Sequence, residues 1–235
     1  MPSSKIEQLE KRINYPFKNK NLLKEALTHR SYLNENAKWP LPHNERLEYL
    51  GDAVLELITT DFLFRRFPKH DEGTLTSFRA ALVNFQMLGR VAREIELERF
   101  LLLSKGEAKD MGKAREVILA NALEALIGAL YLDGGYEMVK QKIEELVLPH
   151  IDEILEKKLY RDPKSLLQEI VQEKRKITPT YQVIEERGPD HQKEFVLSVF
   201  FGNEEIAQGA GTSKQEAESK AAEAALDKFK KGELS

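Results

Sequence analysis

The feature that most constrains the fold is the apolar stretch at residues 117–132, in which only Asn121 and Glu124 carry strongly polar groups. A helix that is apolar on all sides belongs in a protein core. The two polar residues are three positions apart, so they share one face of that helix. Because burying an unpaired carboxylate is costly, a core glutamate is normally paired with Arg or Lys or bound to a metal ion. The stretch therefore predicts a core helix with one polar spot, and both kinds of partner for Glu124 stay open.

A second predicted helix, at residues 43–55, carries an acidic stripe made by Glu45, Glu48 and Asp52. At about 100° per residue, the three carboxylates fall within an arc of roughly 60°. Carboxylates this close raise one another's pKa unless a cation lies between them. A solvated acidic face is the alternative explanation, and such faces are common on surface helices.

Together, the two helices offer only oxygen ligands. Hard oxygen donors select Mg²⁺ or Mn²⁺ over softer metals, and a Mg²⁺ ion that keeps several waters suits phosphoryl chemistry. The chain has no cysteine, which excludes a disulfide scaffold, thiolate-bound zinc, iron–sulfur chemistry and a thiol nucleophile. The pattern favours metal-dependent chemistry at a phosphate group.

The chain divides into two parts by its hydrophobic pattern. Residues 5–156 show helical spacing almost throughout, and prolines and a turn at residues 71–73 separate the helices. No apolar signal region and no uninterrupted apolar run of membrane length is expected in the chain. A polar linker at residues 157–162 precedes Pro163, which stands at a plausible first helical position. We therefore expect domains at residues 1–156 and 163–235.

The second part has a different periodicity. A helix at residues 164–173 is followed by strands at 180–185, 195–201 and 204–211, with a hairpin turn signal at Gly202 and Asn203. A final helix at residues 213–231 begins with Ser213 and Glu216 in capping-box positions. The predicted order is α-β-β-β-α. Since basic and acidic residues are equally numerous in residues 157–235 and the whole chain has a net charge of −3, any phosphate contact must come from a local cluster.

Several segments resemble the ribonuclease III family. Residues 44–55, Asn-Glu-Arg-Leu-Glu-Tyr-Leu-Gly-Asp-Ala-Val-Leu, are similar to the family signature nearly residue for residue, and further matches follow in order at 26–32, 71–73, 79–80 and 122–129. Residues 163–231 resemble the double-stranded RNA-binding domain that follows the nuclease domain in bacterial members. The resemblance implies an all-helical N-terminal nuclease and dimerisation domain followed by a small α-β-β-β-α double-stranded RNA-binding domain.

The resemblance also implies the residues of the nuclease site. Position 121 is aspartate in the family pattern and asparagine in this chain. Glu72 matches an acidic residue near the cleavage region, and we expect an auxiliary role for it. The implied cofactor is Mg²⁺, with Mn²⁺ as a substitute and no small-molecule cofactor. Catalytic roles fall on Glu45, Asp52 and Glu124, and metal ligation falls on Glu48, Asp52, Asn121 and Glu124.

Three regions of the second part are implied to contact RNA: its first helix, the loop at residues 188–191 and the start of its last helix. Such a domain recognises A-form RNA through 2′-hydroxyl and phosphate contacts. The family favours adjacent lysines at the start of the last helix, whereas here Gln215 follows Lys214, so we expect modest RNA affinity. The predicted RNA-binding residues are Gln168, Glu169, Pro189, His191, Ser213, Lys214 and Lys220.

The resemblance implies a homodimeric, cytoplasmic endonuclease that cuts double-stranded RNA with metal-activated water. It would leave 5′-phosphate and 3′-hydroxyl ends with a short 3′ overhang, in the processing of ribosomal and messenger RNA, without a membrane partner. We expect Asn121 to impair cleavage. The alternative is a double-stranded RNA-binding protein that cleaves weakly or not at all. A purely structural helical dimerisation module would leave Asn121 and Glu124 unexplained.

Overall fold

The computed structural model describes residues 3–109, 112–189 and 193–234 of the chain. It divides into two compact units, residues 1–160 and 161–235, which are treated separately below. The dividing point falls inside the segment expected as a linker, and the ends of that linker stay a prediction.

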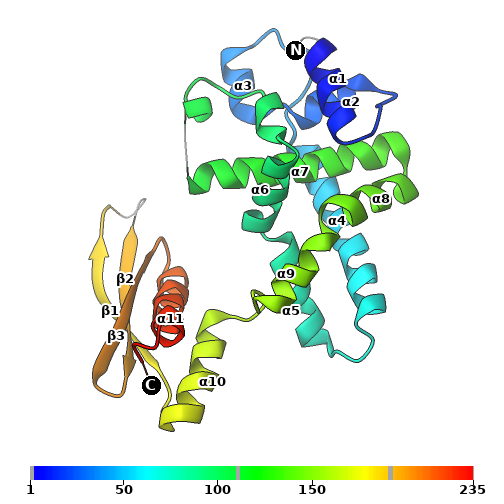
Figure 1. Cartoon of the computed structure of the whole chain (residues 1–235). Helices are drawn as coiled ribbons and strands as arrows, with labels where there is room; N and C mark the ends of the chain where they lie inside the picture. The colour runs from blue at the N-terminus through cyan, green and yellow to red at the C-terminus, as the bar shows by residue number, and fades with distance from the viewer. Residues whose placement is uncertain (1–2, 110–111, 190–192, 235) are drawn as a thin grey trace. The chain divides into compact units, whose positions relative to one another are not determined.

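The first unit is helical (Figure 1). Within the described residues of this unit, β-type pairing is limited to an isolated bridge between Thr28 and Leu102. The helices are α1 (Ser3–Arg12), α2 (Lys20–Ala26), α3 (Arg30–Glu35), α4 (Glu45–Arg66), α5 (Glu72–Val83), α6 (Phe85–Glu94), α7 (Lys113–Gly134), α8 (Tyr136–Leu146) and α9 (Ile151–Glu156), with short 3₁₀ turns η1 (Leu97–Phe100), η2 (Glu107–Lys109) and η3 (Leu148–His150).

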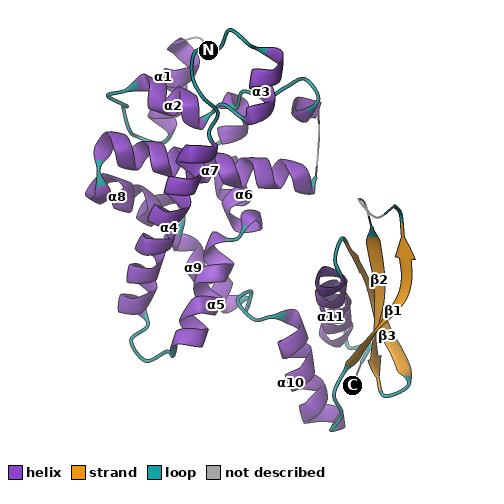
Figure 2. Ribbon diagram, turned by 180° about the vertical axis from the view of Figure 1, so that it is seen from behind, coloured by secondary structure: helices purple, strands orange, loops and turns teal. Residues whose placement is uncertain are grey.

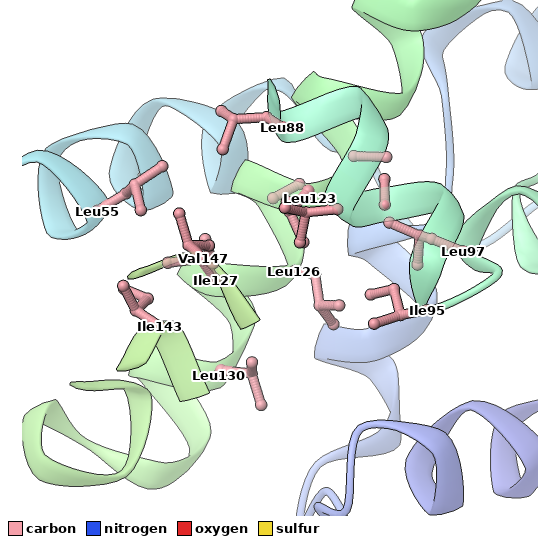
Figure 3. Packing of buried hydrophobic residues seen from close by; sticks show 14 of the residues in the cluster. Leu55, Leu88, Ile95, Leu97, Leu123, Leu126, Ile127, Leu130, Ile143 and Val147 are labelled. Carbon is pink, nitrogen blue, oxygen red and sulfur yellow. The ribbon is translucent and has the colours of Figure 1, made fainter. Parts of the chain in front are cut away.

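Helix α7 runs through the middle of this unit and packs against α4, α6, α2 and α8. Figure 3 shows its leucine and isoleucine side chains meeting residues of the surrounding helices. The prediction that residues 117–132 form a core helix is thus confirmed. By length and composition, residues 114–134 would pass as a membrane span, yet 61% of that window is buried, as in the core helix of a globular domain.

Helices α4 and α7 touch through two glycines. A β-carbon added at Gly51 would lie 1.8 Å from the backbone oxygen of Glu124, and one at Gly128 would lie 2.2 Å from the backbone oxygen of Leu47. Real β-carbons do not approach other atoms so closely, so larger residues would force the helices apart. The two glycines therefore set the distance at which the helices cross.

The second unit contains α10 (Pro163–Arg175), the strands β1 (Thr180–Arg187), β2 (Glu194–Phe201) and β3 (Glu204–Gly211), and α11 (Lys214–Lys230). The sheet is antiparallel with the strand order β1-β2-β3, and α11 lies along the sheet (Figure 2). Leu197, Val199 and Phe201 of β2 are buried, as the alternation predicted, but Val196 and Ser198 between them are buried as well. The α-β-β-β-α order is confirmed, with β1 two residues longer than predicted and a register shift between Val183 and Glu185.

Small residues bring α11 close to β3. A β-carbon at Gly209 would lie 2.2 Å from the backbone nitrogen of Ala221, and one at Gly211 would lie 2.8 Å from that of Ala217. The start of α11 is capped as the sequence predicted, because the hydroxyl of Ser213 accepts a hydrogen bond from the Glu216 backbone nitrogen at 3.2 Å. The returning Glu216 carboxylate accepts from the backbone nitrogen of Thr212 at 2.9 Å, one residue before the position that a standard capping box uses.

Candidate functional site

The start of α4 is fixed by Asn44, which precedes the acidic stripe. Its buried side chain donates to the backbone oxygen of Ala26 at 3.3 Å, and its backbone nitrogen donates to that of Thr28 at 2.9 Å. Glu45 is consequently the first residue of α4 and stands beside the segment that follows α2. The helix expected from residue 43 begins two residues later for this reason.

An arginine and a histidine flank the exposed carboxylate of Glu45. A guanidinium nitrogen of Arg30 lies 3.6 Å from one carboxylate oxygen, and Nδ1 of His43 lies 3.8 Å from the other. Arg30 lies in the segment at residues 26–32 that resembles the family, and His43 is the first residue of the helix expected at residues 43–55. Their spacing along the sequence does not predict that both side chains lie beside Glu45. Their proximity depends on the contact between the α4 start and residues 26–28.

The polar residues of the two motif helices meet at the glycine crossing. Gly51 contacts the backbone of Glu124, so Glu48 and Asp52, on either side of that glycine, are brought next to the polar face of α7. Asp52 is exposed, whereas Glu48, Asn121 and Glu124 are partly buried. The predicted metal-ligand residues therefore come from two helices whose separation is fixed by backbone contact.

The carboxylates of the site lie close to one another without a nearby cation to compensate their charge. Burial, and then the nearby carboxylates of Asp52 and Glu48, together raise the pKa of Glu124 to about 8. Burial, then Glu45 and Asp52, likewise raise the pKa of Glu48. None of the groups that shift either pKa is a cation. This excludes, among the described residues, the alternative in which Glu124 is a core glutamate neutralised by Arg or Lys.

These carboxylates do not already form a closed metal cage. Among the described residues, no group of three or more His, Cys, Asp or Glu side chains is gathered tightly enough to be recognised as a metal site. The donor set still fits a divalent cation, because it consists of oxygens and holds a partly buried carboxylate whose charge has no other compensation.

Glu72 lies apart from this group. It is the first residue of α5, its carboxylate accepts from the Thr76 hydroxyl at 3.1 Å, and it lines a cavity of about 380 Å³ beside Thr60 and Phe64. Thr60 is eight residues beyond Asp52, which corresponds to roughly 12 Å along the helix axis. The structure of one chain thus does not bring Glu72 to the other predicted site residues.

The predicted RNA-binding residues of the second unit lie on its surface where they are described. Gln168 and Glu169 are exposed on α10, Pro189 is exposed at the end of a described segment, and Ser213 and Lys214 begin α11. His191 lies outside the described residues. The two predicted lysines have acidic neighbours: Nζ of Lys214 is 3.6 Å from Glu186, and Nζ of Lys220 is 3.2 Å from Glu216.

An exposed apolar stripe on α4 was not anticipated. Tyr49, Leu57 and Phe64 are 82%, 58% and 70% exposed, and their spacing of seven or eight residues places them on one side of the helix. By contrast, Leu55 of the same helix is fully buried. The seven- and eight-residue spacing of these three residues in the sequence is the signal that could have predicted the stripe.

Comparison with known proteins assigns the family. Residues 19–151 match the family described as ribonuclease-III-like, and residues 163–229 match the double-stranded RNA binding motif. The chain belongs to the ribonuclease III family. It is 46% identical to Ribonuclease 3 of Sulfurovum sp., over 95% of this chain and 98% of that protein. It is 47% identical to Ribonuclease 3 of Desulfotalea psychrophila, over 96% and 93% of the two chains.

A solved structure agrees with this ribonuclease III assignment. The nuclease domain of the Campylobacter jejuni enzyme matches with a TM-score of 0.56 and 44% identity, covering 61% of this chain and 96% of that one. The chain is accordingly an endoribonuclease of the ribonuclease III family that carries a double-stranded RNA-binding domain. The helical nuclease domain and the α-β-β-β-α domain expected from the sequence are confirmed as the fold class.

Proposed function

We propose that this ribonuclease III cleaves double-stranded RNA with Mg²⁺ held by Glu48, Asp52, Asn121 and Glu124, Mn²⁺ being a possible substitute. The observation that carries the proposal is the partly buried Glu124, whose pKa of about 8 results from burial and two neighbouring carboxylates without any compensating cation. A divalent cation is the partner that stabilises such a group in its charged form. When bound, it supplies an activated water and stabilises charge on the departing oxygen.

The protein residues have separable roles in this proposal. Glu124 and Asp52, on opposite helices, would hold the cation, and Glu124 would have to be ionised to do so. Glu45 stays at the exposed edge, where Arg30 and His43 orient its carboxylate toward the cleavage position. The products carry 5′-phosphate and 3′-hydroxyl ends with a short 3′ overhang. A 5′-end-labelled RNA duplex, cut in Mg²⁺ and sized against markers of each end type, tests this outcome.

Asn121 supports a second candidate function. An amide oxygen in place of a carboxylate removes one negative charge from the ligand set, and Mg²⁺ loses its water reluctantly unless ligand charge offsets the cost. The second candidate is therefore a double-stranded RNA-binding protein with weak cleavage. Comparing the chain with Asn121→Asp and Glu124→Gln separates the two. An active chain, an inactive Glu124→Gln and a more active Asn121→Asp support the enzyme. A chain as inactive as Glu124→Gln supports the binding protein.

We also propose a homodimer formed through the nuclease domain. Tyr49, Leu57 and Phe64 form an exposed apolar stripe, and burying such a surface against a second copy of the chain is favourable. The related Campylobacter jejuni domain is described as having a region involved in dimer formation. Phe64→Glu should shift the sedimentation of the chain from dimer toward monomer. Leu132→Glu is the matched control, because Leu132 is a similarly exposed apolar residue on α7 and should leave the dimer intact.

The proposed setting is the cytoplasm, where the enzyme would process ribosomal and messenger RNA precursors. The proposal follows from the family resemblance and the double-stranded RNA binding motif at residues 163–229. Depletion of the protein should cause precursors with double-stranded stems to accumulate, and unchanged precursor lengths after depletion would contradict it.

A further inference from the structure

Near the end of β1, Glu186 faces two lysines from other parts of the second unit. Its carboxylate oxygens lie 2.9 Å from Nζ of Lys193, just before β2, and 3.6 Å from Nζ of Lys214, the first residue of α11. Glu186 pairs in register with Phe195 of β2. These four residues, Glu186, Lys193, Phe195 and Lys214, are called the Glu186 cluster below.

The aromatic ring of Phe195 organises the cluster. Nζ of Lys193 and Nζ of Lys214 lie 5.9 Å and 5.6 Å from the ring centroid, which is the range of cation–π contact. Both ammonium groups are therefore held at one end of the sheet beside the start of α11. This end also carries Ser213 and the hydrogen-bond donors of the helix N-terminus, a favourable place for a phosphate.

We propose that Glu186 sets the affinity of this domain for double-stranded RNA by competing with backbone phosphates for Lys193 and Lys214. The inference rests on the proposed RNA-binding role of Lys214 and adds Lys193 to the phosphate-contacting residues. In this proposal, the Glu186 carboxylate pairs with the two lysines when no RNA phosphate is bound.

Two properties of the cluster make this competition effective. All three charged side chains are more than a third exposed, and exposed ion pairs are weak enough for a phosphate to displace them. After displacement, the Glu186 carboxylate remains beside the bound phosphate and repels it. Contact with Lys193, and then with Lys214, holds the pKa of Glu186 below its usual range, so this negative charge persists at neutral pH.

The neighbouring residue provides a matched control. Glu185 also lies on β1, but its carboxylate accepts a hydrogen bond from Arg187 and contacts neither lysine of the cluster. Glu185→Gln and Glu186→Gln change the total charge identically, one position apart. Any difference between them reports the local contact with Lys193 and Lys214 and excludes a bulk-charge effect. Glu216, the neighbour of Lys220, is unsuitable because it also accepts from the backbone of Thr212.

The test measures binding of the full-length chain to a blunt RNA duplex of about 20 base pairs, long enough for one such domain. Binding is carried out in EDTA so that no cleavage occurs. Glu186→Gln should tighten binding roughly three- to tenfold and steepen the dependence of log affinity on log salt by up to about one unit. Glu185→Gln should change the affinity less than about twofold. In a Lys193→Ala/Lys214→Ala background, the gain from Glu186→Gln should largely disappear.

The outcomes separate this inference from the function on which it rests. If the unmodified chain binds the duplex and Lys214→Ala weakens it, but Glu186→Gln gives no gain, the inference is wrong and RNA binding stands. Equal gains from Glu185→Gln and Glu186→Gln also overturn it, because total charge would then be the cause. An unmodified chain that fails to bind duplex RNA overturns the proposed RNA-binding role itself and the inference with it.

Discussion

Replacing Gly51 with alanine places a methyl group where α4 and α7 touch. The new β-carbon would lie 1.8 Å from the backbone oxygen of Glu124 and 2.9 Å from the backbone nitrogen of Gly128. Because these are backbone atoms of a core helix, no side chain can rotate away to make room. The cost belongs at the upper end of overpacking effects, about 3 kcal/mol. The better helix propensity of alanine returns about 1 kcal/mol, so the net loss of stability is about 2 kcal/mol or more.

Thermal unfolding followed by circular dichroism measures this loss. For a chain of this length, about 2 kcal/mol corresponds to a fall in Tm of roughly 4–8 °C. Gly73→Ala serves as the control, because its β-carbon would meet only the Asp71 side chain at 3.4 Å, so its Tm should stay the same or rise slightly. A Gly51→Ala chain whose Tm lies within 1 °C of the unmodified protein would refute the argument from the helix crossing.

Three further outcomes follow from the site and the RNA-binding domain. Asn121→Asp should raise Mg²⁺-dependent cleavage at least roughly tenfold, about 1.4 kcal/mol in barrier, without raising the metal-free Tm. Equal cleavage by both forms at low Mg²⁺ would remove position 121 from the ligand set. Because the pKa of Glu124 rises from 4.5 to about 8 on folding, its stabilising contribution is complete below the lower value and disappears as the pH rises through the higher one. The metal-free Tm should therefore fall between about pH 4.5 and pH 8 more steeply for the chain than for Glu124→Gln, and parallel curves would contradict the assignment. Binding of duplex RNA in EDTA should weaken steeply with salt, and duplex DNA should compete poorly because it lacks the 2′-hydroxyl; filter binding with equal affinities for both duplexes would be the contrary result.

Local patterns in the sequence were sufficient for the elements of the fold. The apolar stretch at residues 117–132 predicted the core helix, and the alternation at residues 195–201 predicted a strand, because each pattern reflects burial of one element's own faces. The capping residue Ser213 likewise predicted the start of α11. The burial of side chains on α4 was harder to predict from the sequence. Leu55 lies beside the acidic stripe on a helical projection, yet it is fully buried. A projection does not show how many neighbours a helix has.

The candidate site was predictable as a set of residue types and not as an arrangement. The residue patterns and the resemblance both indicated Asn121 and Glu124 as partners of the acidic stripe, but the approach of α4 to α7 depends on contacts between residues far apart in the chain. The same holds for Arg30 beside Glu45 and for Glu186 beside Lys214. Such pairs depend on tertiary packing, and neither propensity nor periodicity encodes it.

The close seating of α11 on Gly209 and Gly211 bears on how quickly and selectively the domain can engage RNA. A helix held by backbone contact has little freedom to tilt or slide, so the position of its first turn is settled before any RNA arrives. Binding then requires little ordering of the protein, and its entropic cost falls mainly on the lysine side chains that become ordered. If α10 and the start of α11 contact RNA as proposed, a fixed spacing between them would favour duplexes whose groove width already fits and disfavour those that must deform.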